Sequence, residues 1–347
     1  TGNLNNTESV NFSINHGARK VIFYGVDGMQ YAHYVNMLKD GKLGNFTRLM
    51  GSTGWNGSIN ITGHASTATN PGNAELHTGL NETLTGITAN SGTIPDGNTT
   101  WERLEIFNSS IVTGSIYGKN TSYIPTPLFN NAIPNIDWWQ NRSTFPNSEW
   151  QDPNGGFYAN THNITKKAAE FIGNYSNSSF FLVVYTGVPD ASGHTATDNS
   201  QNYNQSFINV DDGLGMLLDA LEDNGINDTT QILITTDHGW NEGTSNHATA
   251  NADTIVLPIV TNNISMVINL TSDGIREQCE VAPTILQFFG MNSSNYSDIT
   301  NNGCDSMIGS FTVNDTTPPQ VTINSPLVNS STSSVIFNVT LNENGNA

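Results

Sequence analysis

Basic residues are scarce in this sequence. Its 347 residues include 11 Lys and Arg against 30 Asp and Glu, which gives a formal net charge of −19 at pH 7. Charged residues make up only 12% of the chain, so the imbalance comes from the shortage of Lys and Arg and not from an excess of acids. Because a surface of this sign repels polyanions, we expect no nucleic-acid polymer among the partners.

Cysteine and long apolar segments are also rare. No stretch reaches the roughly 18 consecutive apolar residues of a membrane-spanning helix, so we expect no membrane span. The two cysteines, Cys279 and Cys304, are expected to form one disulfide in an oxidising compartment. The chain starts at Thr1 without Met, which either removal of a leader or a trimmed sequence explains.

Asparagine, in contrast, is abundant and often followed by Ser or Thr two positions later. The sequence holds 22 such N-x-S/T sites, from Asn5 to Asn338. They predict N-linked glycans and an extracellular or cell-surface protein. The alternative is that an Asn-, Ser- and Thr-rich composition produces some of these sites by chance.

Apolar runs alternate with helical patterns through most of the chain. Continuous apolar runs predict buried strands at residues 20–26, 111–117, 180–186, 231–236 and 255–260. Spacing of three and four residues predicts helices at 45–50, 101–107, 164–172, 203–221 and 281–289. This alternation predicts an α/β fold, with a mostly parallel sheet covered by helices on both faces.

The ends of the chain differ from its middle. Residues 1–18 are polar and are expected to be a flexible segment, and residues 19–313 are expected to form the catalytic domain. Inside that domain, the Pro-, Asn- and Trp-rich stretch 121–157 is expected to be an irregular lid or insertion.

Residues 314–347 resemble the start of an immunoglobulin-like domain. A Thr-Thr-Pro-Pro linker leads to a short strand at 321–323, and apolar residues then alternate from Val335 to Leu341, with the glycan site Asn338 on the outward face. A complete sandwich needs about seven strands, so this apolar stripe needs a partner. Either the chain continues beyond Ala347, or the strand adds to a neighbouring subunit and builds a head-to-tail assembly.

The stretch from 66 to 80 presents a hydroxyl at the start of a helix. Pro71 is favoured at the first helical position, and Gly79 ends the helix about two turns later. Thr69 therefore lies at a helix N-terminus, where unpaired N–H groups attract anions. An ordinary helix cap is the alternative interpretation.

Metal-ligand residue types follow three predicted strands. Since parallel strands bring their carboxyl ends to one edge of a sheet, we expect these side chains to lie together. Caps, turns and polar loops are the alternatives for each of them singly. The residues are Asp27; Asp190 and His194; and Asp237, His238 and His247.

Four motifs occur in one order: Asp27-Gly28, Thr69-Asn70-Pro71, Pro189-Asp190-x-x-Gly193-His194, and Asp237-His238-Gly239 with His247 after it. Over about residues 19–290 they resemble the alkaline phosphatase superfamily, most closely its type I phosphodiesterase/nucleotide pyrophosphatase branch. The short distance to the last His, and Val256-Leu257-Pro258 after it, are more similar to related transferases and mutases. This departure leaves the substrate branch open.

The resemblance implies two divalent metal ions and a nucleophile. One metal would be held by Asp190, His194 and His247, and the other by Asp27, Asp237, His238 and the Thr69 oxygen. Mixed His and Asp ligands favour zinc over magnesium or calcium. Thr69 would be the nucleophile, Asn90 in Gly86-Ile87-x-x-Asn90 the amide donor to a phosphoryl oxygen, and the helix N–H groups around Asn70 would bind the same phosphate.

Lys119 and two histidines complete the candidates. Gly118-Lys119 resembles a lysine of sulfatases and of monoesterases, which would neutralise the second charge of a phosphomonoester, and an exposed strand-end lysine is the alternative. His64 and His77 are interpreted as packing residues. Position 69 is not Cys, which argues against a sulfatase.

Together these features predict a secreted zinc-dependent phosphoric ester hydrolase that acts on small phosphate esters through a phosphothreonine. A phosphomonoesterase or phosphotransferase of the same superfamily is the nearest alternative. A glycosylated surface or filament-forming structural protein built on this fold is the second.

Overall fold

The computed structural model describes residues 19–119, 128–129, 136–141, 161–262, 276–308, 320–324 and 338–342. The chain divides into two units, Thr1–Gly309 and Ser310–Ala347, and each is described by itself. The predicted flexible segment 1–18 lies outside the described residues, as does most of the predicted insertion 121–157.

An eight-stranded sheet forms the centre of the first unit, in the order β4-β3-β5-β1-β6-β7-β2-β8. Strand β1 pairs in parallel with β5 and β6, and β3 continues the parallel set beyond β5. Among the described strands of this sheet, only β7 runs against its neighbours. The strands are β1 (Lys20–Val26), β2 (Trp55–Asn60), β3 (Val112–Tyr117), β4 (Trp138–Asn141), β5 (Phe180–Thr186), β6 (Thr230–Thr235), β7 (Val256–Thr261) and β8 (Arg276–Glu277).

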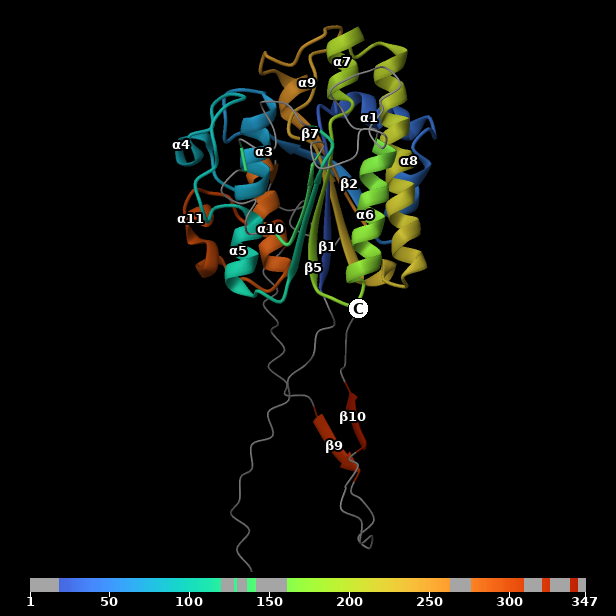
Figure 1. The fold of residues 1–347 in the computed structure, drawn as a ribbon, viewed down its shortest axis with the longest axis vertical. Coiled ribbons are helices and arrows are strands. Elements are labelled where there is room, and N and C mark those ends of the chain that lie inside the picture. The colour runs from blue at the N-terminus through green and yellow to red at the C-terminus, as the bar shows by residue number, and fades with distance from the viewer. Residues whose placement is uncertain are drawn as a thin grey trace, which may run out of the picture. The chain divides into compact units, whose positions relative to one another are not determined.

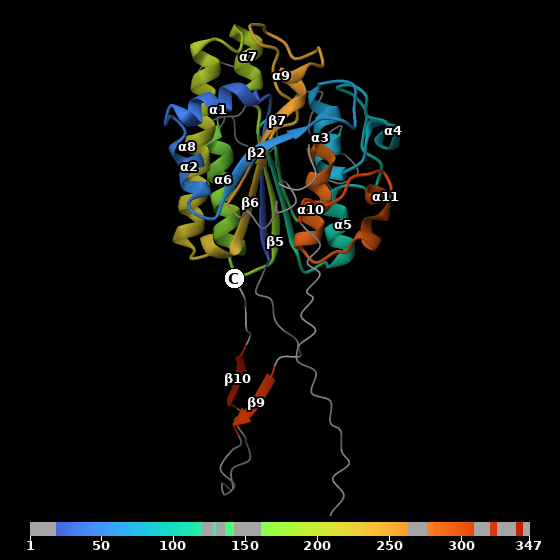
Figure 2. The ribbon, with the colours of Figure 1, turned by 180° about the vertical axis from the view of Figure 1, so that it is seen from behind.

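Helices cover both faces of this sheet (Figures 1 and 2). On one face lie α1 (Tyr31–Lys39), α2 (Gly44–Met50), α6 (Thr161–Tyr175) and α8 (Gln201–Asp223). On the other lie α3 (Thr69–Thr78), α5 (Thr100–Phe107) and α10 (Val281–Phe288). Alternate residues of β1 enter the two cores, Val21 and Phe23 on the α3 side and Ile22 and Tyr24 on the α8 side. Burial on both faces explains the unbroken apolar runs.

Short helices complete the first unit. They are α4 (Glu82–Thr85), α7 (Asp190–Ala196), α9 (Ala252–Ile255), α11 (Ser297–Thr300) and the 3-10 helices η4 (Asn227–Thr229), η6 (Gln278–Glu280) and η7 (Ser293–Tyr296). No helix in the described ranges is long and apolar enough to cross a membrane.

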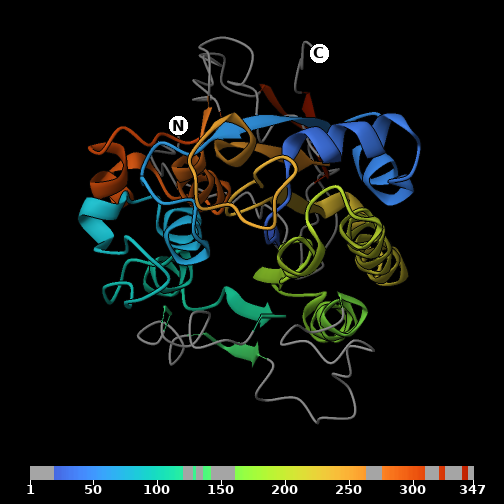
Figure 3. The ribbon, with the colours of Figure 1, turned by 90° about the horizontal axis from the view of Figure 1, so that it is seen from above.

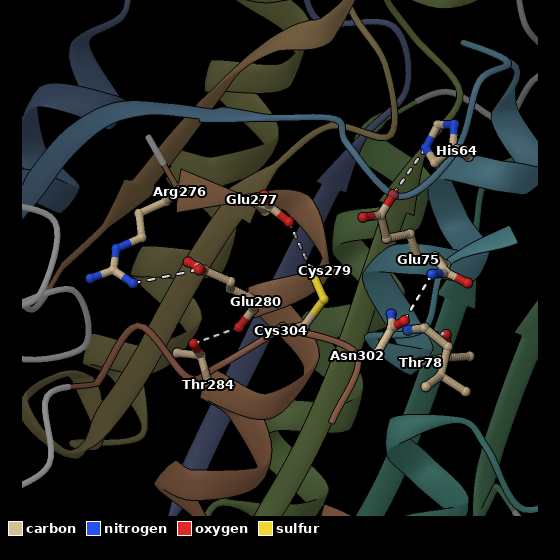
Figure 4. The surroundings of a disulfide bond; sticks show 12 residues. His64, Glu75, Thr78, Arg276, Glu277, Cys279, Glu280, Thr284, Asn302 and Cys304 are labelled. Atoms are coloured by element: carbon tan, nitrogen blue, oxygen red, sulfur yellow. Dashed lines mark hydrogen bonds and ion pairs between the residues drawn. A yellow bond between two sulfur atoms is a disulfide. The ribbon is translucent and has the colours of Figure 1, made fainter. Parts of the chain in front are cut away.

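The predicted disulfide is present. Cys279 in η6 is bonded to Cys304, which follows α11 (Figure 4). The bond therefore connects the start of α10 to the segment after α11.

The mostly parallel α/β sheet is confirmed, and the structure adds elements that the sequence analysis missed. Strand β2 reads Trp-Asn-Gly-Ser-Ile-Asn, and its residues are mostly half-buried, so no apolar run marks it. Helix α1 buries only Tyr34 and Met37, which is too few to give a clear helical period. Helix α7 begins at Asp190, inside the motif where a turn was the alternative.

Helix α3 begins two residues earlier than predicted, at Thr69, with Ala68 as its cap. Pro71 still lies in the first turn, where a missing N–H leaves no helical hydrogen bond unmade. Gly79 ends the helix in the left-handed conformation, with a φ of 68°, as predicted.

In the second unit, β9 (Gln320–Asn324) and β10 (Asn338–Asn342) form an antiparallel pair. Val339 pairs with Ile323, and Leu341 pairs with Val321. The remaining residues of the predicted stripe, Val335 and Phe337, lie outside the described residues. The immunoglobulin-like domain stays a prediction.

Candidate active site at the carboxyl edge of the sheet

Four strands deliver polar side chains to one edge of the sheet. Asp27 follows β1, Lys119 follows β3, Asp190 follows β5 and Asp237 follows β6, and all four are buried. Figure 3 views this edge from above, with α3 in light blue on one side and the gold segment that follows β6 lying over the strand ends. The edge is the expected ligand-binding position of an open α/β sheet.

One group of potential metal ligands consists of Asp190, His194 and His247, whose ligand atoms all lie within 4.8 Å of one another. Asp190 Oδ1 is 3.3 Å from His194 Nε2 and 3.4 Å from His247 Nε2. The two imidazole Nε2 atoms are 3.3 Å apart. Helix α7 brings Asp190 and His194 to the same face because they are separated by four residues.

A second group consists of Asp27, Asp237 and His238, whose ligand atoms also lie within 4.8 Å of one another. His238 Nε2 lies 3.5 Å from Asp27 Oδ1 and 3.5 Å from Asp237 Oδ2. Thr69 Oγ1 is 3.5 Å from the same nitrogen, so the hydroxyl at the start of α3 faces this group. The structure therefore brings together all seven residues that the resemblance named as ligands.

The three histidines are anchored through the same ring nitrogen, Nδ1. His194 Nδ1 donates to the carbonyl of Ser245 at 3.1 Å, and His238 Nδ1 donates to that of Gly239 at 2.9 Å. His247 Nδ1 donates to the Thr67 carbonyl at 2.5 Å, and the Thr67 hydroxyl donates back to the His247 carbonyl. Anchoring Nδ1 in this way leaves the lone pair of each Nε2 directed at the carboxylates, as in metal-binding histidines.

Lys119 lies between the two groups. Its Nζ donates to Asp27 Oδ2 at 2.6 Å, to Asp190 Oδ2 at 2.9 Å and to Thr69 Oγ1 at 3.2 Å. Its side chain is only 7% exposed, so the alternative of an exposed strand-end lysine is wrong. The ammonium thus contacts one carboxylate of each group and the candidate nucleophile.

The carboxylates carry unequal pKa shifts. Burial raises the pKa of Asp27 well above its usual range, and the charges of Asp190 and Asp237 add to the rise. Burial likewise raises the pKa of Asp237 to about 6. Burial alone would also raise the pKa of Asp190, but Lys119 and His194 hold it well below its usual range. Three buried acids facing one ammonium leave an excess of negative charge.

Two of the three imidazoles do not offset this negative charge. Burial lowers the pKa of His238 to about 4 and that of His247 to about 3, so both rings are neutral near pH 7. The pKa of His194, which is more exposed, is raised by the neighbouring Asp190 carboxylate. Neutral rings offer a lone pair, which is the form that binds a metal.

Two carboxylate oxygens of the candidate site have no hydrogen-bond partner. Asp27 Oδ1 and Asp190 Oδ1, one in each group, are buried and accept no hydrogen bond. Each faces the Nε2 lone pair of a neutral histidine, an arrangement that a cation between them would stabilise. The two groups therefore fit divalent metals, with Asp190, His194 and His247 around one and Asp27, Asp237, His238 and Thr69 around the other.

Asn90 lies next to the start of α3. Its Oδ1 accepts a hydrogen bond of 2.8 Å from the main-chain N–H of Asn70. The main-chain N–H of Asn70 thus donates to Asn90, and substrate binding by Asn70 stays a prediction. The Asn70 side chain is fully buried, and neither of its polar atoms has a hydrogen-bond partner.

Several supporting residues were not predicted. Asn73 Nδ2 donates to the Thr69 carbonyl at 3.0 Å and lies 3.4 Å from Asp237 Oδ2. Gln278 Nε2 donates to the carbonyls of Thr236 and Asp237 at 3.0 and 2.9 Å. Thr67, which anchors His247, is the third. Apart from the contact of Asn73 with Thr69, these contacts join residues distant in sequence, so only a motif could have marked them.

Gly28 has a visible structural reason. Its φ is 70°, and a Cβ there would lie 2.9 Å from Asp190 Cβ. Only glycine combines this left-handed backbone with so close an approach. Gly28 thereby lets the Asp27 and Asp190 segments come together.

His64 and His77 lie outside both ligand groups. His64 Nε2 is 3.1 Å from Gln278 Oε1 and 3.2 Å from Glu75 Oε2 (Figure 4). His77 stacks on Trp101 and pairs with the Tyr117 hydroxyl at 2.8 Å, and burial lowers its pKa to about 3.

Comparison with solved structures defines the class of fold. A 2-O GAG sulfatase matches with 12% identity and a TM-score of 0.57, covering 79% of this chain and 71% of that chain. A protein of the alkaline phosphatase superfamily from Vibrio parahaemolyticus matches with 16% identity and a TM-score of 0.50, covering 79% and 67%. The lipoteichoic acid synthase LtaP from Listeria monocytogenes matches with 14% identity and a TM-score of 0.51, covering 80% and 73%. The chain has the alkaline phosphatase-like fold.

The family follows from the sequence itself. Residues 21–273 match the model of the type I phosphodiesterase/nucleotide pyrophosphatase family, and the chain belongs to that family. This membership places it in the alkaline phosphatase superfamily and among its hydrolases. No curated protein matches the sequence.

Proposed function

We propose that this protein is a secreted, zinc-dependent phosphoric ester hydrolase that acts through a phosphothreonine at Thr69. The observation that carries the proposal is the placement of Thr69 Oγ1 beside both ligand groups, 3.5 Å from His238 Nε2 and 3.2 Å from Lys119 Nζ. A hydroxyl is a weak nucleophile unless its oxygen is stabilised as an anion, and this position supplies that stabilisation.

Zinc is the metal that the donor set favours. Each group offers imidazole nitrogen together with carboxylate oxygen, whereas magnesium and calcium prefer oxygen alone. Two zinc ions bound there would polarise the Thr69 hydroxyl and the phosphoryl oxygens. Binding would also satisfy Asp27 Oδ1 and Asp190 Oδ1, the two buried oxygens without partners.

The chain's own residues carry the remaining steps. Thr69 Oγ1 bonds to phosphorus as the bond from phosphorus to the leaving oxygen breaks. The hydroxyl proton passes to solvent, and the leaving oxygen takes a proton from water. Water then displaces Thr69, which restores the hydroxyl and releases phosphate or a phosphomonoester. Lys119 stabilises the charge on Thr69 Oγ1 because its ammonium lies within hydrogen-bond distance.

Asn90 positions the phosphoryl group. Because its Oδ1 accepts the Asn70 N–H, its amide hydrogens point away from α3's first turn and can donate to a non-bridging oxygen. A donor fixed in this way stabilises the charge that builds up on the phosphoryl oxygens in the transition state. Asn70 then contributes by orienting Asn90.

The preferred substrate is a small phosphodiester or pyrophosphate, in line with the family. Lys119 favours one alternative, a phosphomonoesterase or phosphotransferase, because a buried ammonium matches the second negative charge of a monoester. A sulfatase is disfavoured because position 69 holds Thr where sulfatases derive their nucleophile from Cys.

An extracellular location fits the glycan sites. Wherever the structure describes the burial of a glycan-site asparagine, that residue is exposed or half-buried, whereas the fully buried asparagines Asn70, Asn73 and Asn241 belong to no such site. Glycans need solvent-facing acceptors. The disulfide between Cys279 and Cys304 fits the same oxidising compartment.

The test is a side-by-side assay of chromogenic phosphate diesters, phosphate monoesters and sulfate esters. Protein stripped by a chelator is assayed before and after addition of zinc. The proposal predicts that zinc restores turnover of the phosphodiester above the other two. Turnover of the sulfate ester alone, or of none of the three with zinc bound, would contradict it.

A further inference from the structure

A third group of potential ligands lies outside the candidate active site. It consists of His33 in α1, Asp198 after α7 and Glu242 after β6, and its ligand atoms all lie within 4.8 Å of one another. Each of the three residues lies a short way along the chain from active-site residues. His33 follows Asp27, Asp198 follows Asp190 and His194 of α7, and Glu242 follows His238.

Each side chain has one atom held by a neighbour and one atom directed at the others. His33 Nδ1 pairs with Asn204 Oδ1 at 3.2 Å, so it is anchored through the same ring nitrogen as the three active-site histidines. Asp198 Oδ1 accepts the Gly243 N–H at 2.9 Å, and Glu242 Oε1 accepts from Asn199 Nδ2 at 3.1 Å. Glu242 Oε2 also accepts a longer hydrogen bond of 3.3 Å from Gln30 Nε2.

The remaining atoms converge. His33 Nε2 lies 3.6 Å from Asp198 Oδ2 and 3.9 Å from Glu242 Oε2. Ligand atoms about 2.1 Å from a tetrahedral ion lie about 3.4 Å from one another. The two separations from His33 Nε2 therefore need only a small contraction for these atoms to surround a metal, and the two carboxylate oxygens lie within 4.8 Å of each other.

Asp198 has a buried carboxylate oxygen without a hydrogen-bond partner. The residue is fully buried, and its Oδ2 accepts no hydrogen bond. In the part of the chain that the structure describes, neither Asp198 nor Glu242 pairs with a Lys or Arg. Burial raises the pKa of Asp198, and the charge of Glu242 adds to the rise. A buried carboxylate oxygen directed at a second carboxylate is costly without a cation.

We propose that His33 Nε2, Asp198 Oδ2 and Glu242 Oε2 form a third metal site, which takes a divalent transition-metal ion such as zinc or manganese. One imidazole and two carboxylates suit such an ion and balance its charge. The side chain of Glu242 is 55% exposed and that of His33 15% exposed, so water completes the shell from the open side.

The site is separate from the active site and supports it. The rings of Trp240 and Tyr203 lie between the two sites. The ring centroids of Trp240 and His194 are 4.8 Å apart, and those of Tyr203 and His33 are 5.4 Å apart. A metal at the third site ties together the three segments that carry active-site ligands. Its role is structural, and the proposal does not depend on the reaction at Thr69.

The test counts metal in the full chain. Chelator-stripped protein is dialysed against graded free zinc, with excess calcium to suppress weak binding to surface acids, and zinc per chain and the unfolding temperature are measured. His33→Gln and Glu242→Gln each remove one ligand, and circular dichroism verifies their folds. Glu222→Gln is the matched control, because Glu222 is an exposed acid paired with Arg48 elsewhere on the surface.

The proposal predicts that each variant binds about one zinc fewer than the wild type and the control. It also predicts that zinc raises the unfolding temperature less in the variants. Equal zinc counts in all four proteins would overturn the third site. The measured quantity is the difference in zinc content between the proteins, so the test is valid whether or not the protein hydrolyses phosphate esters.

Discussion

Lys119 Nζ donates a 2.6 Å hydrogen bond to Asp27 Oδ2, although the two residues end different strands. Lys119 also binds Asp190 Oδ2, so Oδ1 of each aspartate is left for the proposed metals. The same ammonium lies 3.2 Å from Thr69 Oγ1, where it can also meet a phosphoryl oxygen.

Lys119 should discriminate between ester classes. Lys119→Met removes the charge that pairs with a second phosphate charge, so kcat/KM for a monoester should fall at least about tenfold more than that for a diester. Lys119→Arg keeps the charge and serves as the control. Equal losses on both esters would remove Lys119 from substrate discrimination.

His247 should hold one metal. His247→Ala removes a side chain whose Nε2 faces Asp190 Oδ1 at 3.4 Å, so elemental analysis should find about one zinc per chain fewer and turnover should be lost. His162→Ala, at an exposed position of α6, is the control and should keep the full count. A full zinc count with full activity in His247→Ala would refute the ligand assignment.

Glu75 should set a pH dependence of stability. Burial, with the charge of Glu277 adding to it, raises the pKa of Glu75 from 4.5 to about 8. The folded state therefore binds more protons than the unfolded state between those values, and the free energy of unfolding should fall as pH rises from about 5 to 8. Each unit of difference between the folded-state and unfolded-state pKa corresponds to about 1.4 kcal/mol in the free energy of unfolding.

Urea unfolding at pH 5, 6.5 and 8 measures this effect. Glu75→Gln keeps the shape without the charge and should flatten the decline, whereas Glu170→Gln, which removes an exposed partner of Lys167, should leave it unchanged. The same decline in Glu75→Gln and the wild type would assign the titration to another group.

The second unit should control assembly if its strand pair adds to a neighbouring subunit. Among the described residues, β9 and β10 form a two-stranded sheet, and a pair of strands on its own is marginal in water. Deleting residues 318–347 should then shift the mass distribution in light scattering towards single chains. An unchanged distribution would show that the tail has no role in assembly.

The sequence predicted the central strands and the ligand residues because both leave local signals. An unbroken apolar run marks β1, and short motifs mark Asp190, His194, Asp237 and His238. The direction of β7 was not predictable, because an apolar run reads the same in either direction. The contacts of Lys119 depend on the order of the strands in the sheet, which no local pattern carries.

The third metal group escaped the sequence analysis for a related reason. His33, Asp198 and Glu242 belong to no motif, and each has an ordinary interpretation as a polar surface residue. Only the packing of α1, α7 and the segment after β6 brings them together.

The most direct test of the account is the role of the Thr69 oxygen. Zinc-loaded wild type, Thr69→Ser and Thr69→Ala are compared on a chromogenic phosphodiester, with zinc content and circular dichroism measured in parallel. The account predicts that Thr69→Ala stays folded but loses at least about a thousandfold in kcat, while Thr69→Ser, which keeps a hydroxyl, retains measurable turnover. Undiminished turnover by folded Thr69→Ala would contradict it.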